Sequence, residues 1–177
     1  METTRRDFLG RAAIGPAILA AAGSGRAAAA NSRVRTAVVG TGGRGTHLLG
    51  LALHRAQEKG DVEIVALCDV YQKRLDAARA LAKSKGHDPK TFTHHQDLLA
   101  QRDIDAVIIA TPDHWHAPVT LLALEGGRDV YCEKPMTHTL EEARQVSEKG
   151  KSLNRVMQVG VQGTSWTRWH RIHDLIQ

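Results

Sequence analysis

The sequence has 177 residues, of which 42% are hydrophobic and 24% are charged, and its formal net charge is +5. This length allows one domain with at most part of a second, and the apolar content suffices for a hydrophobic core, which argues against wholesale disorder. The positive charge does not indicate nucleic-acid binding, because residues 1–30 carry four arginines against two acids, the remainder has no basic block, and only 4% of residues are aromatic.

Residues 1–30 have the features of a targeting segment and are set apart from the fold. Arg5–Arg6 stand shortly before Phe8 and Leu9, a weakly apolar alanine-rich stretch follows, and Ala27–Asn31 offers small residues for cleavage. The stretch is too short to serve as a membrane anchor, and an amphipathic N-terminal helix is the alternative. The order of these features resembles a bacterial twin-arginine (Tat) signal, which implies a periplasmic or secreted protein that is exported folded.

Short apolar runs alternate with helical patterns after Asn31. The expected strands are Val34–Gly40, Val62–Asp69, Asp105–Thr111, Asp129–Cys132 and Arg155–Val161. They are almost continuously apolar, which is typical of parallel strands covered on both faces. The expected helices are residues 44–58, 71–84, 116–125 and 140–149, the last opened by a capping box of Thr139 and Glu142. The alternation predicts an α/β fold, a doubly wound parallel sheet with right-handed crossovers.

The chain has two cysteines, Cys68 and Cys132. In the usual strand order of this fold they lie three inter-strand steps apart, or about 14 Å at ~4.8 Å per step. A disulfide requires Cα atoms within roughly 7 Å of each other. Two free thiols are therefore expected.

A glycine-rich turn, VVGTGGRG (Val38–Gly45), follows the first expected strand. The spacing Gly40-x-Gly42-x-x-Gly45 between a strand and a helix, with a second strand ending at Asp69, is typical of dinucleotide binding. The glycines permit the tight turn, the close approach of a pyrophosphate and the close packing of the helix on the strand. Neighbouring residues expected to contact the nucleotide are Thr41, Gly43, Arg44, Val70 and Arg74. A glycine-rich turn without a ligand is the alternative.

Asp69 bears on the choice of cofactor. It is expected to accept hydrogen bonds from the adenosine ribose, and its charge would repel the 2′-phosphate of NADP, which carries about −1.5 to −2. NAD is therefore favoured. Arg44 and Arg74 are close enough in sequence to soften this preference, so NADP stays open.

The segment ATPDHWHAP (Ala110–Pro118) follows the third expected strand. Ligands of doubly wound sheets bind beyond the carboxyl ends of the strands, so this loop should border the cofactor. The residues concerned are Thr111, Pro112, His114, Trp115 and His116. For each of them, packing at the start of a helix is the alternative. The histidine pairs of the chain have no companion carboxylate or cysteine at a ligand spacing, so no metal site is expected.

The segment VYCEKPM (Val130–Met136) ends an apolar run with Glu133 and Lys134, followed by Pro135. A solvated ion pair at the end of a strand is one interpretation. The other is that Lys134 is a catalytic acid/base at the rim of the cofactor site, because the preceding strand ends at the same edge of the sheet as the glycine-rich turn.

Together, GTGGRG, CDVYQKR, ATPDHWH and VYCEKP resemble the Gfo/Idh/MocA oxidoreductases over about residues 33–162. The resemblance implies a Rossmann NAD(P)-binding domain at residues 31–160 and a C-terminal α/β substrate domain, whose beginning would be residues 161–177. We expect the chain to be a fragment of a longer protein, inactive by itself, with a homo-oligomeric parent; a stand-alone module is the alternative.

The resemblance also implies hydride transfer between NAD(P) and a sugar or cyclitol hydroxyl. Lys134 would be the catalytic acid/base, Glu133 would orient Lys134 or contact the nicotinamide end of the cofactor, and a cis Lys134–Pro135 bond would fix the loop. An alternative within the family is NAD-dependent glycoside hydrolysis through transient oxidation, in a branch that shares a Trp-His pair like Trp115–His116 but lacks the E-K-P tripeptide. A non-catalytic NAD-binding module is a further alternative.

Overall fold

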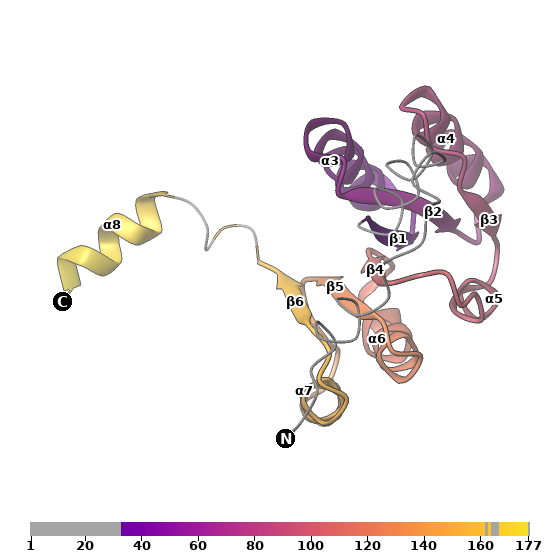
Figure 1. Ribbon diagram of the computed structural model, residues 1–177. Coiled ribbons are helices and arrows are strands. Elements are labelled where there is room, and N and C mark those ends of the chain that lie inside the picture. Colours follow the sequence, from indigo (N-terminus) through magenta and orange to yellow (C-terminus); the bar gives the residue numbers. More distant parts are fainter. Residues whose placement is uncertain (1–32, 162, 164–166, 177) are drawn as a thin grey trace, which may run out of the picture. The chain divides into compact units, whose positions relative to one another are not determined.

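The computed structural model describes residues 33–161, 163 and 167–176, so the expected export signal lies outside the described residues. The described strands form one sheet in the order β3-β2-β1-β4-β5-β6, and each neighbouring pair is parallel (Figure 1). The strands are β1 (Val34–Val39), β2 (Val62–Cys68), β3 (Lys90–Phe92), β4 (Ala106–Ile109), β5 (Asp129–Glu133) and β6 (Met157–Gly160). The order reverses between β1 and β4, which is where such sheets bind ligands.

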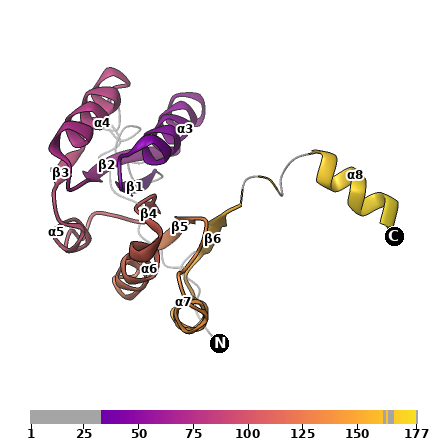
Figure 2. The same ribbon diagram turned by 180° about the vertical axis from the view of Figure 1, so that it is seen from behind.

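Helices cover both faces of the sheet. They are α3 (Gly43–Lys59), α4 (Gln72–Ser84), α5 (His95–Leu99), α6 (His116–Glu125) and α7 (Leu140–Ser152), with a short 3₁₀ turn η1 (Asp113–Trp115) before α6. Figures 1 and 2 show α3 and α4 on one side of the sheet and α5, α6 and α7 on the other. A last described helix, α8, spans Thr167–Ile176.

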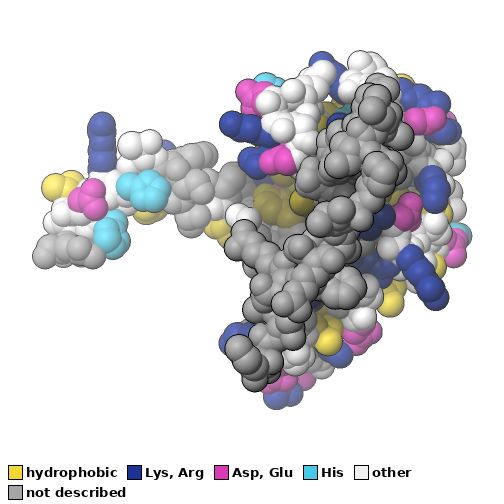
Figure 3. All heavy atoms as spheres, viewed as in Figure 1, with side chains coloured by type: hydrophobic (Ala, Val, Ile, Leu, Met, Phe, Trp, Pro, Cys, Tyr) yellow, Lys and Arg dark blue, Asp and Glu magenta, His cyan; other side chains and the backbone are white. Residues whose placement is uncertain are grey.

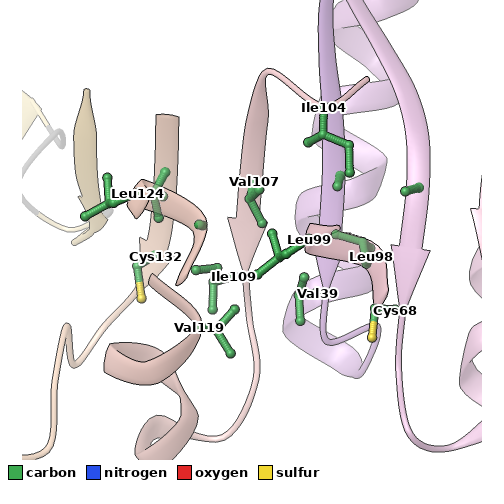
Figure 4. Packing of buried hydrophobic residues seen from close by; sticks show 14 residues of the cluster. Val39, Cys68, Leu98, Leu99, Ile104, Val107, Ile109, Val119, Leu124 and Cys132 are labelled. Carbon is green, nitrogen blue, oxygen red and sulfur yellow. The ribbon is translucent and has the colours of Figure 1, made fainter. Parts of the chain in front are cut away.

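Each face of the sheet has its own hydrophobic core. Under α3 and α4, Leu49, Leu53 and Leu75 are at most 1% exposed and pack on β1 and β2. On the other face, a second cluster joins α5 and α6 to the sheet (Figure 4). Cys68 and Cys132 lie on opposite sides of this second cluster in Figure 4, on strands separated by β1 and β4, and both are free thiols as expected.

The structure confirms the five expected strands and the four expected helices, and their ends differ from the expected ones by at most three residues. The capping box of α7 is present: Glu142 N donates to Thr139 Oγ1, and Thr139 N donates to Glu142 Oε2. The elements β3 and α5 were not expected. They have three and five residues, which is too short for a periodic apolar pattern.

Basic and acidic side chains are interspersed on the face shown in Figure 3. Within the described ranges, no helix is long and apolar enough to cross a membrane. The last described strand, β6, ends at Gly160. The domain boundary at residue 160 and the C-terminal domain stay predictions.

Candidate functional site

The glycine-rich turn brings the start of α3 against the sheet. Gly40 has φ +86°, and a Cβ added there would lie 2.6 Å from the Ala110 carbonyl oxygen. A Cβ added at Gly45 would lie 1.8 Å from the Gly40 carbonyl oxygen. Only glycine fits these contacts, so the turn from β1 to α3 is closed as the sequence predicts. No side chain among the described residues caps the N-terminus of α3 at Gly42, which leaves its first amides free for an anion.

Asp69 follows β2 and holds the glycine-rich turn in place. Its Oδ2 accepts hydrogen bonds from Thr41 N (2.7 Å) and Thr41 Oγ1 (3.1 Å), and its Oδ1 accepts one from Tyr71 N (2.9 Å). A carboxylate has about four acceptor positions, so about one is left for a ribose hydroxyl. From the sequence, Asp69 is expected to bind the ribose. The structure adds a second role, because Asp69 also holds the glycine-rich turn through its hydrogen bonds with Thr41.

A first pocket of about 330 Å³ lies beyond the carboxyl ends of β1, β2 and β4. The predicted site residues in its lining are Gly40, Gly42, Asp69, Val70, Arg74, Thr111, Pro112 and Trp115. The lining also contains residues 93–96, which follow β3 and include the first two residues of α5. The sequence does not predict this segment, because both elements are short. His95 from this segment meets Trp115 edge-on, with ring centroids 5.3 Å apart. The lining of the pocket thus includes an aromatic pair as well as the glycine-rich turn.

The two arginines expected to soften the preference for NAD lie at different places. Arg74 lines the first pocket, with its guanidinium carbon 5.6 Å from the centroid of the Tyr71 ring. Arg44 is absent from that lining and points to the other end of the site. Arg74 therefore shares the first pocket with Asp69, whereas Arg44 lies in the lining of the second pocket.

A second pocket, also of about 330 Å³, adjoins the first through Ala110 and Thr111, which line both. The other residues in its lining are Arg44, Asp113, His116, Glu133 and Lys134. Lys134 is exposed, whereas Glu133 is buried at the end of β5. The Lys134–Pro135 peptide bond is cis, as the resemblance implied. Lys134 therefore lies in a pocket that adjoins the first one.

The three aromatic residues of the segment after β4 have different environments. His116 is 2% exposed, and its Nδ1 and Nε2 lie 2.6 Å from Pro135 O and 3.0 Å from Thr111 O. In either tautomer at least one nitrogen donates to a carbonyl, so His116 connects the segments after β4 and β5. His114 is exposed and is in the described lining of neither pocket. Trp115 lines the first pocket, so only two of the three aromatic residues border the site.

The two pockets fit a dinucleotide. The first amides of α3 suit a pyrophosphate, and the buried Oγ1 of Thr111 has no hydrogen-bond partner among the described residues, although Thr111 borders both pockets. A buried hydroxyl without a partner is costly, and a polar ligand in either pocket would satisfy it. By contrast, no group of three or more metal-ligating side chains occurs in the described part of the chain.

Curated relatives match the same part of the chain. A glycosyl hydrolase family 109 protein of Shewanella sp. (strain W3-18-1) is 36% identical over 127 residues, which is 69% of this chain and 27% of that protein. The chain thus spans about a quarter of the length of the curated relatives that it matches.

Solved structures of dehydrogenases have the same fold. The myo-inositol dehydrogenase of Lactobacillus casei, in complex with NAD(H) and myo-inositol, superposes with a TM-score of 0.70 and 25% identity over 81% of this chain and 41% of that one. The WlbA dehydrogenase of Chromobacterium violaceum, in complex with NADH and UDP-GlcNAcA, gives a TM-score of 0.66 and 27% identity over 76% of this chain and 36% of that one.

The family model of the Gfo/Idh/MocA oxidoreductases, described as having an NAD-binding Rossmann fold, matches residues 34–161. These residues span all six described strands and both pockets. The chain therefore belongs to the Gfo/Idh/MocA oxidoreductase family and contains its NAD-binding Rossmann domain.

Proposed function

We propose that the whole protein transfers a hydride between NAD and a hydroxyl-bearing carbon of a sugar or cyclitol, with Lys134 as the acid/base. The observation that carries the proposal is the position of Lys134. Lys134 lines the second pocket, which shares Ala110 and Thr111 with the pocket that contains Asp69 and the glycine-rich turn. An amine at this place is next to the end of the cofactor site that lies away from the adenosine ribose.

Different residues of the chain bind different parts of the cofactor. The α3 amides bind the pyrophosphate and Asp69 binds the adenosine ribose. Thr111 donates a hydrogen bond to a polar group of the ligand where the two pockets meet. Bound NAD supplies the hydride acceptor. Lys134 in its neutral form takes the proton of the substrate hydroxyl as the carbon is oxidised, and returns it when the reaction runs in reverse. The alcohol thus loses the proton of its hydroxyl oxygen to Lys134 and a hydride from its hydroxyl-bearing carbon to the cofactor, which leaves a ketone.

The relatives support this substrate class. One of the solved dehydrogenases binds myo-inositol, a cyclitol, and another binds UDP-GlcNAcA, a nucleotide sugar. Both molecules carry ring hydroxyls that can be oxidised to ketones. A sugar or cyclitol is therefore the class of substrate to test first.

The second candidate is NAD-dependent glycoside hydrolysis, which the identity to glycosyl hydrolase family 109 proteins favours. In that reaction a sugar is oxidised transiently and reduced again, so no net change of NAD is measured. Lys134 within E-K-P argues for the dehydrogenase, because the hydrolase branch is expected to lack this tripeptide.

The experiment has one part on the 177-residue chain and one on the whole protein. The chain should bind NADH in a fluorescence titration, and Lys134→Ala should keep this affinity within about threefold. In the whole protein, Lys134→Ala should reduce sugar or cyclitol oxidation by about 10²–10⁴-fold, with Lys134→Arg as a charge-matched control. Release of nitrophenol from a nitrophenyl glycoside without a sugar acceptor would favour the hydrolase, and NADH binding without either activity would favour a non-catalytic module.

We also propose that the protein is exported through the Tat pathway, that it keeps its cofactor bound, and that the parent is a homo-oligomer. The first proposal rests on Arg5–Arg6 and the apolar stretch behind them. A dissociable cofactor would be lost outside the cytoplasm, so it should stay bound and be recycled within each catalytic cycle. Cell fractionation with Arg5→Lys/Arg6→Lys tests the export, and purified protein without nucleotide would contradict the retention. Light scattering of the parent tests the oligomer.

A further inference from the structure

An ion pair joins the glycine-rich turn to the segment that bears Lys134. Arg44, in the first turn of α3, places Nε 2.7 Å and Nη2 2.6 Å from Oε1 of Glu133, the last residue of β5. The Glu133 side chain is 6% exposed and the Arg44 side chain 34%. The hydrogen bond to this carboxylate raises the pKa of Arg44 above its usual value. A buried carboxylate is therefore compensated by a guanidinium that comes from a helix 89 residues away in sequence.

The same carboxylate contacts the backbone of Lys134. Oε2 of Glu133 accepts a hydrogen bond from Lys134 N at 3.3 Å, while Oε1 accepts a further one from Tyr131 Oη, also at 3.3 Å. Burial, with the neighbouring Glu133 carboxylate, raises the pKa of Tyr131, so its hydroxyl stays protonated and can donate. One carboxylate thus links the Arg44 guanidinium to the backbone that presents the Lys134 amine.

The neighbouring strand leaves room for this network. Gly160 of β6 pairs with Glu133 in the sheet register. A Cβ at Gly160 would lie 2.5 Å from Tyr131 Oη and 2.7 Å from Glu133 Oε1. The network therefore fills the space that a side chain at position 160 would need.

From these contacts we infer that Arg44 is a positioning residue for Lys134, acting through Glu133, and not a ligand of the nucleotide phosphates or ribose. The inference deepens the proposed function and rests on it for the role of Lys134. It joins the two halves of the site: the helix whose first amides face the cofactor also fixes the backbone at which the acid/base is carried. The geometry of the Lys134 segment then depends on α3 as well as on β5.

The first test is hydrogen exchange of the backbone amides of residues 131–136 in the 177-residue chain. Arg44→Met and Glu133→Gln should each speed exchange there by about tenfold or more, and Arg44→Lys should restore part of the protection. Arg55→Met is the matched control, because Arg55 makes the same kind of two-donor contact with Asp61 at the far end of α3. Arg55→Met should leave the hydrogen-exchange rates of residues 131–136 unchanged.

The second test separates positioning from ligand binding. In the 177-residue chain, Arg44→Met should change the NADH and ADP-ribose affinities by less than about threefold. In the whole protein it should lower kcat at least tenfold with little change in the amount of NAD bound to the purified protein, and Arg44→Lys should recover part of kcat. A tenfold loss of ADP-ribose affinity with unchanged exchange at residues 131–136 would overturn the inference, because Arg44 would then be a phosphate ligand.

A double variant separates loss of positioning from loss of folding. Arg44→Met alone leaves the buried charge of Glu133 uncompensated and can unfold the chain, whereas Arg44→Met/Glu133→Gln removes both charges. In the double variant, hydrogen exchange at residues 131–136 should be no faster, and kcat no lower, than in either single variant. Additive effects of the two substitutions would contradict a shared network. If the unchanged chain does not bind NADH, the proposed function fails, while the exchange measurements still decide whether Arg44 holds the Lys134 segment.

Discussion

Replacing Gly45 by alanine tests whether the close contact between α3 and the glycine-rich turn sets both stability and cofactor binding. The added Cβ would lie 1.8 Å from the Gly40 carbonyl oxygen. Carbon and oxygen atoms in close contact are normally about 3.3 Å apart, so α3 and the turn must separate by roughly 1.5 Å. Both atoms belong to the backbone or are attached directly to it, so no side-chain rotation can relieve the clash.

The magnitude follows from this geometry. Overpacking costs roughly 1–3 kcal/mol, and a clash with a backbone oxygen should lie near the upper value. For a domain of this size, about 3 kcal/mol corresponds to a fall in Tm of roughly 10–15 °C. The displaced α3 amides should also bind a pyrophosphate less well, because their effect on an anion is confined to the first turn. We expect the NADH affinity to fall at least tenfold.

The assay compares thermal unfolding by circular dichroism and NADH binding for Gly45→Ala and for Gly43→Ala. Gly43 is the matched control, because a Cβ added there meets no atom within 4 Å. Its Tm should stay within about 3 °C of the unchanged chain, or rise slightly, since alanine favours the helix by up to about 1 kcal/mol. Equal Tm and equal affinity in Gly45→Ala and the unchanged chain would refute the reasoning.

Three other expectations follow from the described contacts. Asp69→Asn should reduce the preference for NADH over NADPH by about tenfold in paired titrations, because the charge that repels a 2′-phosphate is lost; an unchanged ratio would assign the preference elsewhere. Burial raises the pKa of Cys68 to about 12 and that of Cys132 to about 11, so at pH 8 both thiols should react with a disulfide reagent only after denaturation, and fast reaction of the folded chain would contradict their burial. Burial also lowers the pKa of His87, whose Nδ1 accepts a hydrogen bond from Ile64 N. As the pH falls, His87 therefore binds a proton in the unfolded chain before it does so in the folded chain, and the free energy of unfolding should decrease below about pH 6.5. His87→Gln should weaken this pH dependence in urea titrations.

The fold can be predicted from the sequence because the local patterns of apolar and capping residues match the elements that the chain forms. Near-continuous apolar runs correspond to strands buried on both faces, and the capping box marks the start of α7 within the sequence itself. The elements that escape prediction, β3 and α5, lie at the edge of the sheet and are short, so they are held by packing rather than by a pattern of their own. These elements nevertheless contribute the segment 93–96 to the first pocket.

The site is predicted less completely than the fold. Motif residues such as Gly40 and Asp69 are found because spacing alone indicates their chemistry. The partner of Arg44 could not be found in this way, because its contact with Glu133 joins residues 89 apart in sequence and depends on how α3 lies against β5. The same holds for His116, whose buried ring contacts the carbonyls of Thr111 and Pro135 across two segments.

The contacts described for the Lys134 segment come from within residues 33–161. Arg44 reaches it through Glu133 from α3, and His116 reaches Pro135 from α6. Since these elements also border the two pockets, a ligand that shifts α3 or α6 would shift the Lys134 backbone as well. We therefore expect NADH to slow hydrogen exchange at residues 131–136 in the unchanged chain, and to do so less in Arg44→Met. Equal slowing in both would mean that the cofactor reaches this segment without Arg44, by direct contact or through His116.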